Sequence, residues 1–228
     1  AAGIAGLIKT LLAMHHKILP PSLHFEKPSD HSPLHNGPFR VQTQAKSWHR
    51  RKENQLRRAA VNAFGFGGIN AHLLLEEWDP EFYKIGPNHE APKQEITLSD
   101  PTYPDTDVAI IGMDTIFGSI GSLRQFQEQI FRGETNIHKR PASRWKGCDH
   151  IAGSYLGNQA LHGSFLDDFS ISTGEFHIPP NEIPDILPQQ LLMLKVAAKA
   201  LKDATCPLSE DKPTMGALIG IEFDFEAT

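Results

Sequence analysis

Apolar residues near the start of the chain recur at helical spacing and stop before a pair of prolines. The apolar positions with this spacing are Ile4, Leu7, Ile8, Leu11 and Leu12. They predict a helix, in which Gly3 and Gly6 allow a neighbour to pack closely. Pro20 and Pro21 end it, because proline cannot continue a helix. Residues 22–45, with three further prolines, predict a loop with short extended pieces.

Two apolar runs flank a glycine-rich stretch further along the chain. The run Arg58–Asn62 predicts a strand that enters the glycine stretch. Leu73, Leu74 and Leu75 follow it and predict a second strand, buried because all three side chains are apolar.

The pattern restarts after residue 106. The short β-branched run Asp107–Gly112 predicts a buried strand followed by a turn. An amphipathic helix should follow, with Ser122 as its N-cap. The apolar positions of this helix are Leu123, Phe126, Ile130 and Phe131.

The last third of the chain continues the alternation. An irregular stretch from Gly133 to about Ile178 precedes a strongly apolar helix over 187–201. The run Met215–Gly220 predicts another buried strand. Strands that alternate with helices favour an α/β fold.

Charge divides the sequence into three parts. Residues 1–78 carry ten Lys/Arg against five Asp/Glu, a net charge of +5. Residues 79–106 carry two against six, net −4, with five prolines and little apolar periodicity, so we expect a Pro-rich acidic linker. Residues 107–228 carry ten against sixteen, net −6.

Composition excludes several classes of protein. Two cysteines, Cys148 and Cys206, are too few for a disulfide framework and fit a reducing, cytoplasmic compartment. Every long apolar run is broken by charge or proline, so no membrane span is expected, and no signal peptide is visible. Neither end looks like a natural terminus, so we expect a fragment of a larger protein.

The stretch Asn62–His72 is the most informative part of the sequence. Its three glycines within four positions, between two strands, indicate that the backbone must approach another group closely. Such a loop can donate backbone hydrogen bonds to an oxyanion, although a plain tight turn has the same spacing. A dinucleotide fingerprint would need glycine at Asn70, and no Gly-Lys-Ser/Thr of a P-loop follows.

Twelve histidines raise the possibility of a metal site. His31 and His35 are four residues apart, but Pro33 between them opposes a helix, and no further ligands lie at suitable spacing. Solvated loop histidines are the simpler interpretation, and no metal is expected.

Asn62–His72 resembles the C-terminal signature of β-ketoacyl synthases, in which Phe-Gly-Phe-Gly-Gly is followed by Thr-Asn-Ala-His. Ile69 here stands in place of the usual threonine. The opening run Ala1–Lys9 resembles the helix after the family's Gly-His-Thr motif, and Leu19–His24 resembles its next segment. The resemblance covers residues 1–78.

Residues 107–228 resemble the other end of the same family's fold. The matching stretches are Asp107–Met113, Arg144-Trp145, Gly163–Asp168 with Phe176 to Pro179, Leu187–Leu194 and Gly216–Gly220. This copy departs from the family pattern at Leu187, Leu191 and His177, where aspartate, arginine and a glycine-containing bend are usual. The departures hint at a copy relieved of catalysis, as in chain-length factors.

The resemblance implies an α/β, thiolase-like fold of α-β-α-β-α layers in two incomplete copies: 1–78 as the C-terminal part of one, 79–106 as linker and 107–228 as the N-terminal part of the next. Such a tandem is similar to the subunit of polyunsaturated (omega-3) fatty acid synthases that joins a ketosynthase to a chain-length factor. A polyketide synthase with two ketosynthase domains and a non-catalytic scaffold are the alternatives. A circularly permuted single domain would lack the middle of the fold.

The resemblance also implies roles for the loop. The backbone N–H of Phe66 would form half of an oxyanion hole, in a loop with Gly65, Gly67 and Gly68. The reaction would be decarboxylative Claisen condensation, which needs a nucleophilic cysteine and two histidines. None of these lies in this chain, and Cys148 and Cys206 stand in the wrong places, so we expect both to be structural.

Partners follow from the same resemblance. The substrates would arrive on the phosphopantetheine arm of an acyl carrier protein, with no cofactor bound directly. A basic patch formed by Arg50, Arg51, Lys52, Arg57 and Arg58 would dock this acidic carrier, unless it is only a solvated surface. A ketosynthase with a chain-length factor would form a pseudo-dimer, or the protein a homodimer. Nucleic-acid binding is disfavoured by the acidic composition.

Overall fold

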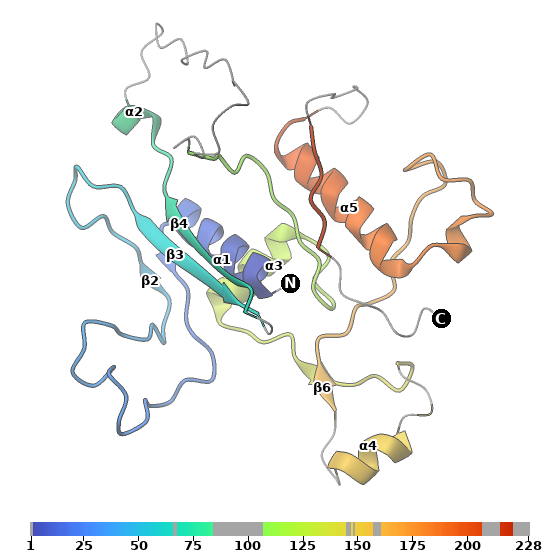
Figure 1. The fold of residues 1–228 in the computed structure, drawn as a ribbon, viewed down its shortest axis with the longest axis horizontal. Coiled ribbons are helices and arrows are strands. Elements are labelled where there is room, and N and C mark those ends of the chain that lie inside the picture. Colours follow the sequence, from blue (N-terminus) through green and yellow to red (C-terminus); the bar gives the residue numbers. More distant parts are fainter. Residues whose placement is uncertain are drawn as a thin grey trace, which may run out of the picture. The chain divides into compact units, whose positions relative to one another are not determined.

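The computed structural model describes residues 2–65, 68–83, 107–144, 147, 149–156, 161–206 and 215–220. These residues form helices and short strands in two compact units, each of which is described by itself (Figure 1). The first unit comprises residues 1–109 and 127–135, and the second comprises residues 110–126 and 136–228.

Helix α1 (Ala2–His16) confirms the first predicted helix and supplies most of the buried side chains of the first unit. Those buried residues are Ile8, Leu12, Ala13 and Met14. Lys17 ends the helix before the two prolines, because its φ of 57° is incompatible with a further helical turn. The chain then forms β1 (Ile18–Leu19), which pairs antiparallel with β2 (Lys46–Ser47) across the predicted loop.

Strands β3 (Arg58–Phe64) and β4 (Asn70–Glu76) form an antiparallel hairpin beside α1 (Figure 1). Ala59, Val61 and Ala63 are half-buried and alternate with exposed neighbours, as expected of a strand with one covered face. A Cβ placed on Gly3 would lie 2.8 Å from the Cβ of Ala63. The predicted close packing is therefore confirmed at Gly3, whereas a Cβ on Gly6 would lie 3.8 Å from Val61.

The strand predicted at Leu73–Leu75 forms as part of β4, but the prediction that it is buried is wrong. Leu73 is 45% exposed and Leu74 is 79% exposed. The sheet contains only two strands, and α1 packs against β3, so the described residues leave most of β4 uncovered.

Helix α2 (Pro80–Tyr83) follows β4 directly. It occupies the first residues of the predicted linker 79–106. Residues 84–106 of that linker lie outside the described residues.

Both strands predicted in the second half are wrong. Residues 107–112 and 215–220 have no regular secondary structure, and Val108 and Leu218 are fully or nearly fully exposed. A strand forms only where another strand accepts its backbone hydrogen bonds, and the described residues place none beside these runs. Gly112 instead lies against the last helix, where an added Cβ would clash with the Ala200 carbonyl oxygen.

Helix α3 (Leu123–Arg132) confirms the predicted amphipathic helix. Its N-cap is Ser122, as expected, because the Ser122 Oγ accepts a hydrogen bond from the Gln125 N–H at 3.3 Å. Asp114 Oδ1 accepts a second one from the Leu123 N–H at 3.2 Å.

The stretch predicted to be irregular contains short elements. Strands β5 (His138–Lys139) and β6 (His162–Gly163) pair antiparallel, and α4 (Asp149–Leu156) lies between them in the sequence. A 3₁₀ turn spans Ile183–Asp185. Two-residue strands are too short to give a periodic signal, which explains why the sequence pattern missed them.

Helix α5 (Pro188–Asp203) confirms the last predicted helix and buries Leu191. Gln190 caps its start by accepting a hydrogen bond on Oε1 from the Leu187 N–H at 3.3 Å. At its end the Cys206 N–H bonds the Leu201 carbonyl at 2.9 Å and the Thr205 N–H bonds the Lys202 carbonyl at 3.0 Å, which is a Schellman motif. Within the described residues, no helix combines the length and apolarity needed to cross a membrane.

Candidate functional site

The glycine-rich loop lies at the tip of the β3–β4 hairpin. The strands pair in one register from Arg58 opposite Glu76 to Phe64 opposite Asn70, which leaves residues 65–69 as the loop. The Gly65 N–H donates to the Ile69 carbonyl at 2.8 Å and closes the loop at its base. Phe66 and Gly67, two of the predicted site residues, lie outside the described residues.

Two glycines of the loop are described, and their geometry accounts for glycine at both positions. Gly68 has a φ of +85°, which side chains disfavour. A Cβ on Gly65 would lie 3.3 Å from the Ile69 carbonyl oxygen and would press on the hydrogen bond at the loop base. A loop of this kind can direct backbone N–H groups toward an oxyanion.

A polar side-chain pair crosses the hairpin close to this loop. Asn62 and His72 stand opposite each other, and Asn62 Oδ1 accepts a hydrogen bond from His72 Nδ1. From the sequence, His72 is recognisable only as part of a signature, because strand register is needed to identify its partner.

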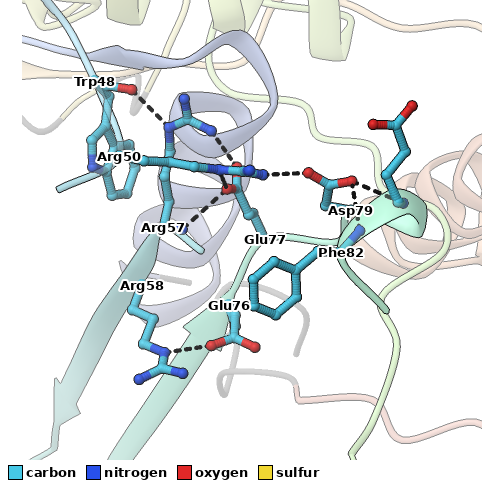
Figure 2. Close-up of polar contacts among 9 residues, drawn as sticks. Trp48, Arg50, Arg57, Arg58, Glu76, Glu77, Asp79 and Phe82 are labelled. Carbon is cyan, nitrogen blue, oxygen red and sulfur yellow. Dashed lines mark hydrogen bonds and ion pairs between the residues drawn. The ribbon is translucent and has the colours of Figure 1, made fainter. Parts of the chain in front are cut away.

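Three of the five residues in the predicted basic patch form ion pairs with carboxylates, so their positive charge is largely neutralised. Figure 2 shows that Arg50 reaches both Glu77 and Asp79, with 2.5 Å from Nε to Glu77 Oε1 and 2.5 Å from Nη2 to Asp79 Oδ2. Arg57 also binds Glu77, through Nη1 to Oε2 and through its backbone N–H to Oε1 at 3.1 Å. We name Arg50, Arg57, Glu77 and Asp79 the strand-exit cluster.

The strand-exit cluster joins the segment before β3 to the segment after β4. Arg57 Nε donates to the Trp48 carbonyl at 2.7 Å, and Asp79 Oδ1 accepts from the Glu81 N–H at 3.0 Å at the start of α2 (Figure 2). The Arg57 and Glu77 side chains are about nine-tenths buried. Its arginines therefore serve the local structure of the first unit.

The pKa values in the cluster follow from these contacts. Partial burial raises the pKa of Glu77, but the hydrogen bonds from Arg57 and Arg50 outweigh it and hold this pKa below its ordinary range. The hydrogen bond from Arg50 holds the pKa of Asp79 below its ordinary range. The pKa of Arg50 is raised, first by the hydrogen bond to Asp79 and then by that to Glu77.

The remaining basic residues differ in their partners. Arg58 pairs with Glu76 across the hairpin, and its side chain is 79% exposed. Arg51 and Lys52 are exposed, and within the part of the chain that the structure describes they form no ion pair. They are the two members of the predicted patch whose charge stays available to a partner.

The carboxylate partners were missed by sequence reasoning, although a signal existed. Basic residues precede β3, and acidic residues follow β4. In an antiparallel hairpin the start of the first strand lies beside the end of the second. Combining the two observations would have predicted the pairing.

The remaining candidate residues are the two cysteines and the loop histidines. Cys206 lies just beyond the end of α5, as expected, with its Sγ 3.8 Å from the Ala204 carbonyl oxygen. Cys148 lies outside the described residues. His35 contacts the Ser29 carbonyl oxygen through Nε2 at 3.0 Å, and among the described residues no group of three His, Cys, Asp or Glu could hold a metal ion.

Known sequence families match the chain in three consecutive stretches. The β-ketoacyl synthase C-terminal domain matches residues 1–26, and the ketoacyl-synthetase C-terminal extension matches residues 28–102. The β-ketoacyl synthase N-terminal domain matches residues 105–228, more than half of the chain.

Individual relatives agree with these families. A subunit of the polyunsaturated fatty acid synthase of a Thraustochytrium species is 29% identical over 99% of this chain, which spans 11% of that protein. A pikromycin polyketide synthase component of Streptomyces venezuelae is 48% identical over 34% of this chain and 2% of its own length. Among solved structures, a ketosynthase from module 6 of the bacillaene synthase of Bacillus subtilis is 44% identical, with a TM-score of 0.34, over 36% of this chain and 15% of that one.

Proposed function

The chain belongs to the β-ketoacyl synthase family, and from this premise we propose that its parent protein is a multidomain synthase that extends acyl chains by decarboxylative Claisen condensation. The family's α/β, thiolase-like fold is the fold class of this chain. Acyl and malonyl groups would arrive as thioesters on the phosphopantetheine arm of an acyl carrier protein in the cytoplasm. The condensing enzyme would transfer the acyl group to a cysteine and join it to the decarboxylated malonyl unit.

One observation carries this proposal: the order of the family matches. A C-terminal domain, its extension and then an N-terminal domain follow one another in a single chain. This order fits the end of one ketosynthase copy, with its extension to residue 102, and the start of a second copy at about residue 105. The polyunsaturated fatty acid synthase subunit aligns along nearly the whole chain, which favours the same tandem in a fatty acid synthase.

In this proposal the glycine loop of the first copy stabilises negative charge on the thioester oxygen. The Phe66 N–H would be one donor, and Gly65, Gly67 and Gly68 would give the backbone the required approach. The closed base of the loop and the positive φ of Gly68 support this role.

We further propose that the second copy is a chain-length factor that pairs with a ketosynthase as a pseudo-dimer. Its departures from the family pattern support this view. Leu191, in place of arginine, is buried in α5, where a charged side chain would need a partner. His177 adopts a φ of 56° where the family has a glycine-containing bend.

The carrier protein would dock on exposed cations of the first copy. Carrier proteins are acidic, so exposed cations would attract them over a distance. Arg51 and Lys52 fit this role better than Arg50, Arg57 and Arg58, whose charges are matched by carboxylates.

The test uses the full-length parent protein with a cysteine-directed ketosynthase inhibitor and with acyl and malonyl carrier protein. Labelling at one cysteine upstream of Ala1, together with a product two carbons longer, supports the ketosynthase and chain-length-factor pair. Absence of both labelling and acyl transfer contradicts the enzyme and favours a scaffold.

A polyketide synthase with two working condensing domains is the second candidate. The higher identity of polyketide synthase components over a third of the chain favours it. Inhibitor labelling at a second cysteine, beyond Thr228, would select this candidate in the same experiment.

A further inference from the structure

We propose that Asn62 and His72 are positioning residues for the glycine loop, because their side-chain hydrogen bond fixes the register of the two strands that carry it. The proposal rests on the function proposed above for the loop. It adds a role for two side chains that lie on the strands and not in the loop.

The pair stands close to the loop in the register of the hairpin. Asn62 faces His72, the next rung is Ala63 opposite Ala71, and the last rung is Phe64 opposite Asn70. The amide oxygen of Asn62 accepts the hydrogen bond, so the His72 ring donates it from Nδ1.

Apolar patterning alone does not fix this register. Leu73, Leu74 and Leu75 are identical neighbours, and they face alternate sides of the hairpin. A slip by one residue would turn His72, Leu74 and Glu76 toward the covered face, so burial opposes it. A slip by two residues keeps each strand's faces and only exchanges one apolar neighbour for another, so hydrophobic burial barely distinguishes these two registers.

Polar cross-strand pairs do distinguish the registers. A slip by two residues would place Asn62 opposite Asn70 or Leu74 in place of His72, and the hydrogen bond to the His72 ring would be lost. The loop between the strands would also change from five residues, and the 2.8 Å hydrogen bond from Gly65 to Ile69 could not form in its present geometry.

A second polar pair lies at the far end of the hairpin and serves as a natural control. Arg58 faces Glu76 four residues before Asn62, and it is a long, largely exposed side chain. Such a side chain reaches diagonal neighbours as well as direct ones. It therefore constrains the register less tightly and does so away from the loop.

The experiment compares four forms of the parent protein: the unchanged protein, His72→Ala, His72→Asn and the control Arg58→Gln. His72→Asn keeps a donor close to the position of Nδ1, whereas His72→Ala removes it. We expect His72→Ala to lower the kcat of condensation about three- to tenfold, with an unchanged KM for the acyl carrier protein. His72→Asn should restore most of the rate.

Amide hydrogen exchange at Gly65 provides a readout that does not depend on catalysis. His72→Ala should accelerate this exchange, and Arg58→Gln should leave both exchange and kcat close to those of the unchanged protein. Equal effects of His72→Ala and Arg58→Gln, or no recovery in His72→Asn, would overturn the positioning role. If the unchanged parent lacks condensing activity, the proposed function fails, while Gly65 exchange still decides the positioning role.

Discussion

Thr205 has a backbone conformation that is unfavourable for a threonine side chain. Its φ of 59° lies in the left-handed region, where a β-branched side chain is strained. It occupies the C′ position of the Schellman motif that ends α5, a position where glycine is preferred. The Schellman motif therefore forms with backbone strain at Thr205, and one substitution can remove that strain.

Thr205→Gly should stabilise the end of α5 by about 1 kcal/mol, because glycine adopts this φ without strain. Hydrogen exchange at the Cys206 amide, which bonds Leu201, measures the change in the parent protein. Ala204→Gly is the matched control. Ala204 has an ordinary φ of −70°, so glycine there should lower the stability of the helix end. Faster exchange in Thr205→Gly would contradict the strain argument.

Glu77 and Asp79 make the first unit sensitive to acid. Their pKa values in the folded protein lie below the ordinary 4.5 and 3.8, so the unfolded chain takes up protons first as the pH falls. The stabilisation from these two carboxylates is complete when the pH is above their ordinary pKa values. It is lost as the pH falls through their pKa values in the folded protein. Protection of the Glu77 amide, which bonds the Arg57 carbonyl, should decrease over this range after correction for intrinsic exchange.

Two variants test which carboxylate pairs cause this loss. Asp79→Asn should remove part of the acid dependence, because it leaves Arg50 with one carboxylate. Glu76→Gln removes the partner of the exposed Arg58 and should change the profile little, since exposed pairs contribute little to stability.

Among the elements, α1 illustrates how two glycines with similar surroundings differ in their tolerance of a side chain. Gly3→Ala should destabilise the contact with β3 by about 1–3 kcal/mol, because the new Cβ would lie 2.8 Å from that of Ala63. Gly6→Ala should be neutral or stabilising by up to about 1 kcal/mol, since its Cβ would meet Val61 at 3.8 Å and alanine favours the helix. Amide exchange of Ala63 in the parent protein checks both, and equal effects would refute the packing argument.

Helices were predicted from sequence more reliably than strands in this chain. The 3.6-residue period identified α1, α3 and α5, because a helix satisfies its backbone hydrogen bonds internally. The runs 107–112 and 215–220 have strand composition but no strand structure, since strand pairing depends on distant residues. The two strands beside the glycine loop were predicted and do form, because each finds its partner close in sequence.

Across the whole molecule, counting basic residues overstates how much positive charge is available on the surface. Arg50, Arg57 and Arg58 are matched by Glu77, Asp79 and Glu76, which leaves Arg51 and Lys52 as the available cations of the predicted patch. The glycine loop could be located from its residues. The pairing of the arginines was missed, because charge alone does not show it and the partners, 18 to 29 positions apart, meet only when the hairpin forms.

Charge reversal separates docking from structure. The double variant Arg51→Glu with Lys52→Glu should weaken carrier-protein binding about three- to tenfold at low salt, and less at high salt, because screening shortens the reach of exposed charges. Binding by titration calorimetry to the parent protein measures this. Glu53→Lys in the same turn is a control that should strengthen binding, and unchanged binding in all variants would exclude this surface as the docking site.

The large apolar side chains on the surface lead to a further expectation. Val108, Leu74 and Leu218 are all more than three-quarters exposed, and large apolar side chains left in water favour association and local unfolding. The 228-residue chain alone should therefore unfold over a broad temperature range and bind a hydrophobic dye before heating. A sharp calorimetric transition without dye binding would contradict this expectation.

The strand-exit cluster has a practical consequence for protein engineers who recombine synthase domains. A junction between Trp78 and Asp79, which charge patterning alone suggests, would keep Arg50 and remove one of its two carboxylates, together with the cap of α2. A donor sequence joined there would need its own acid at the same place. Joining after Tyr83 instead carries the complete ionic cluster and the short helix into every hybrid.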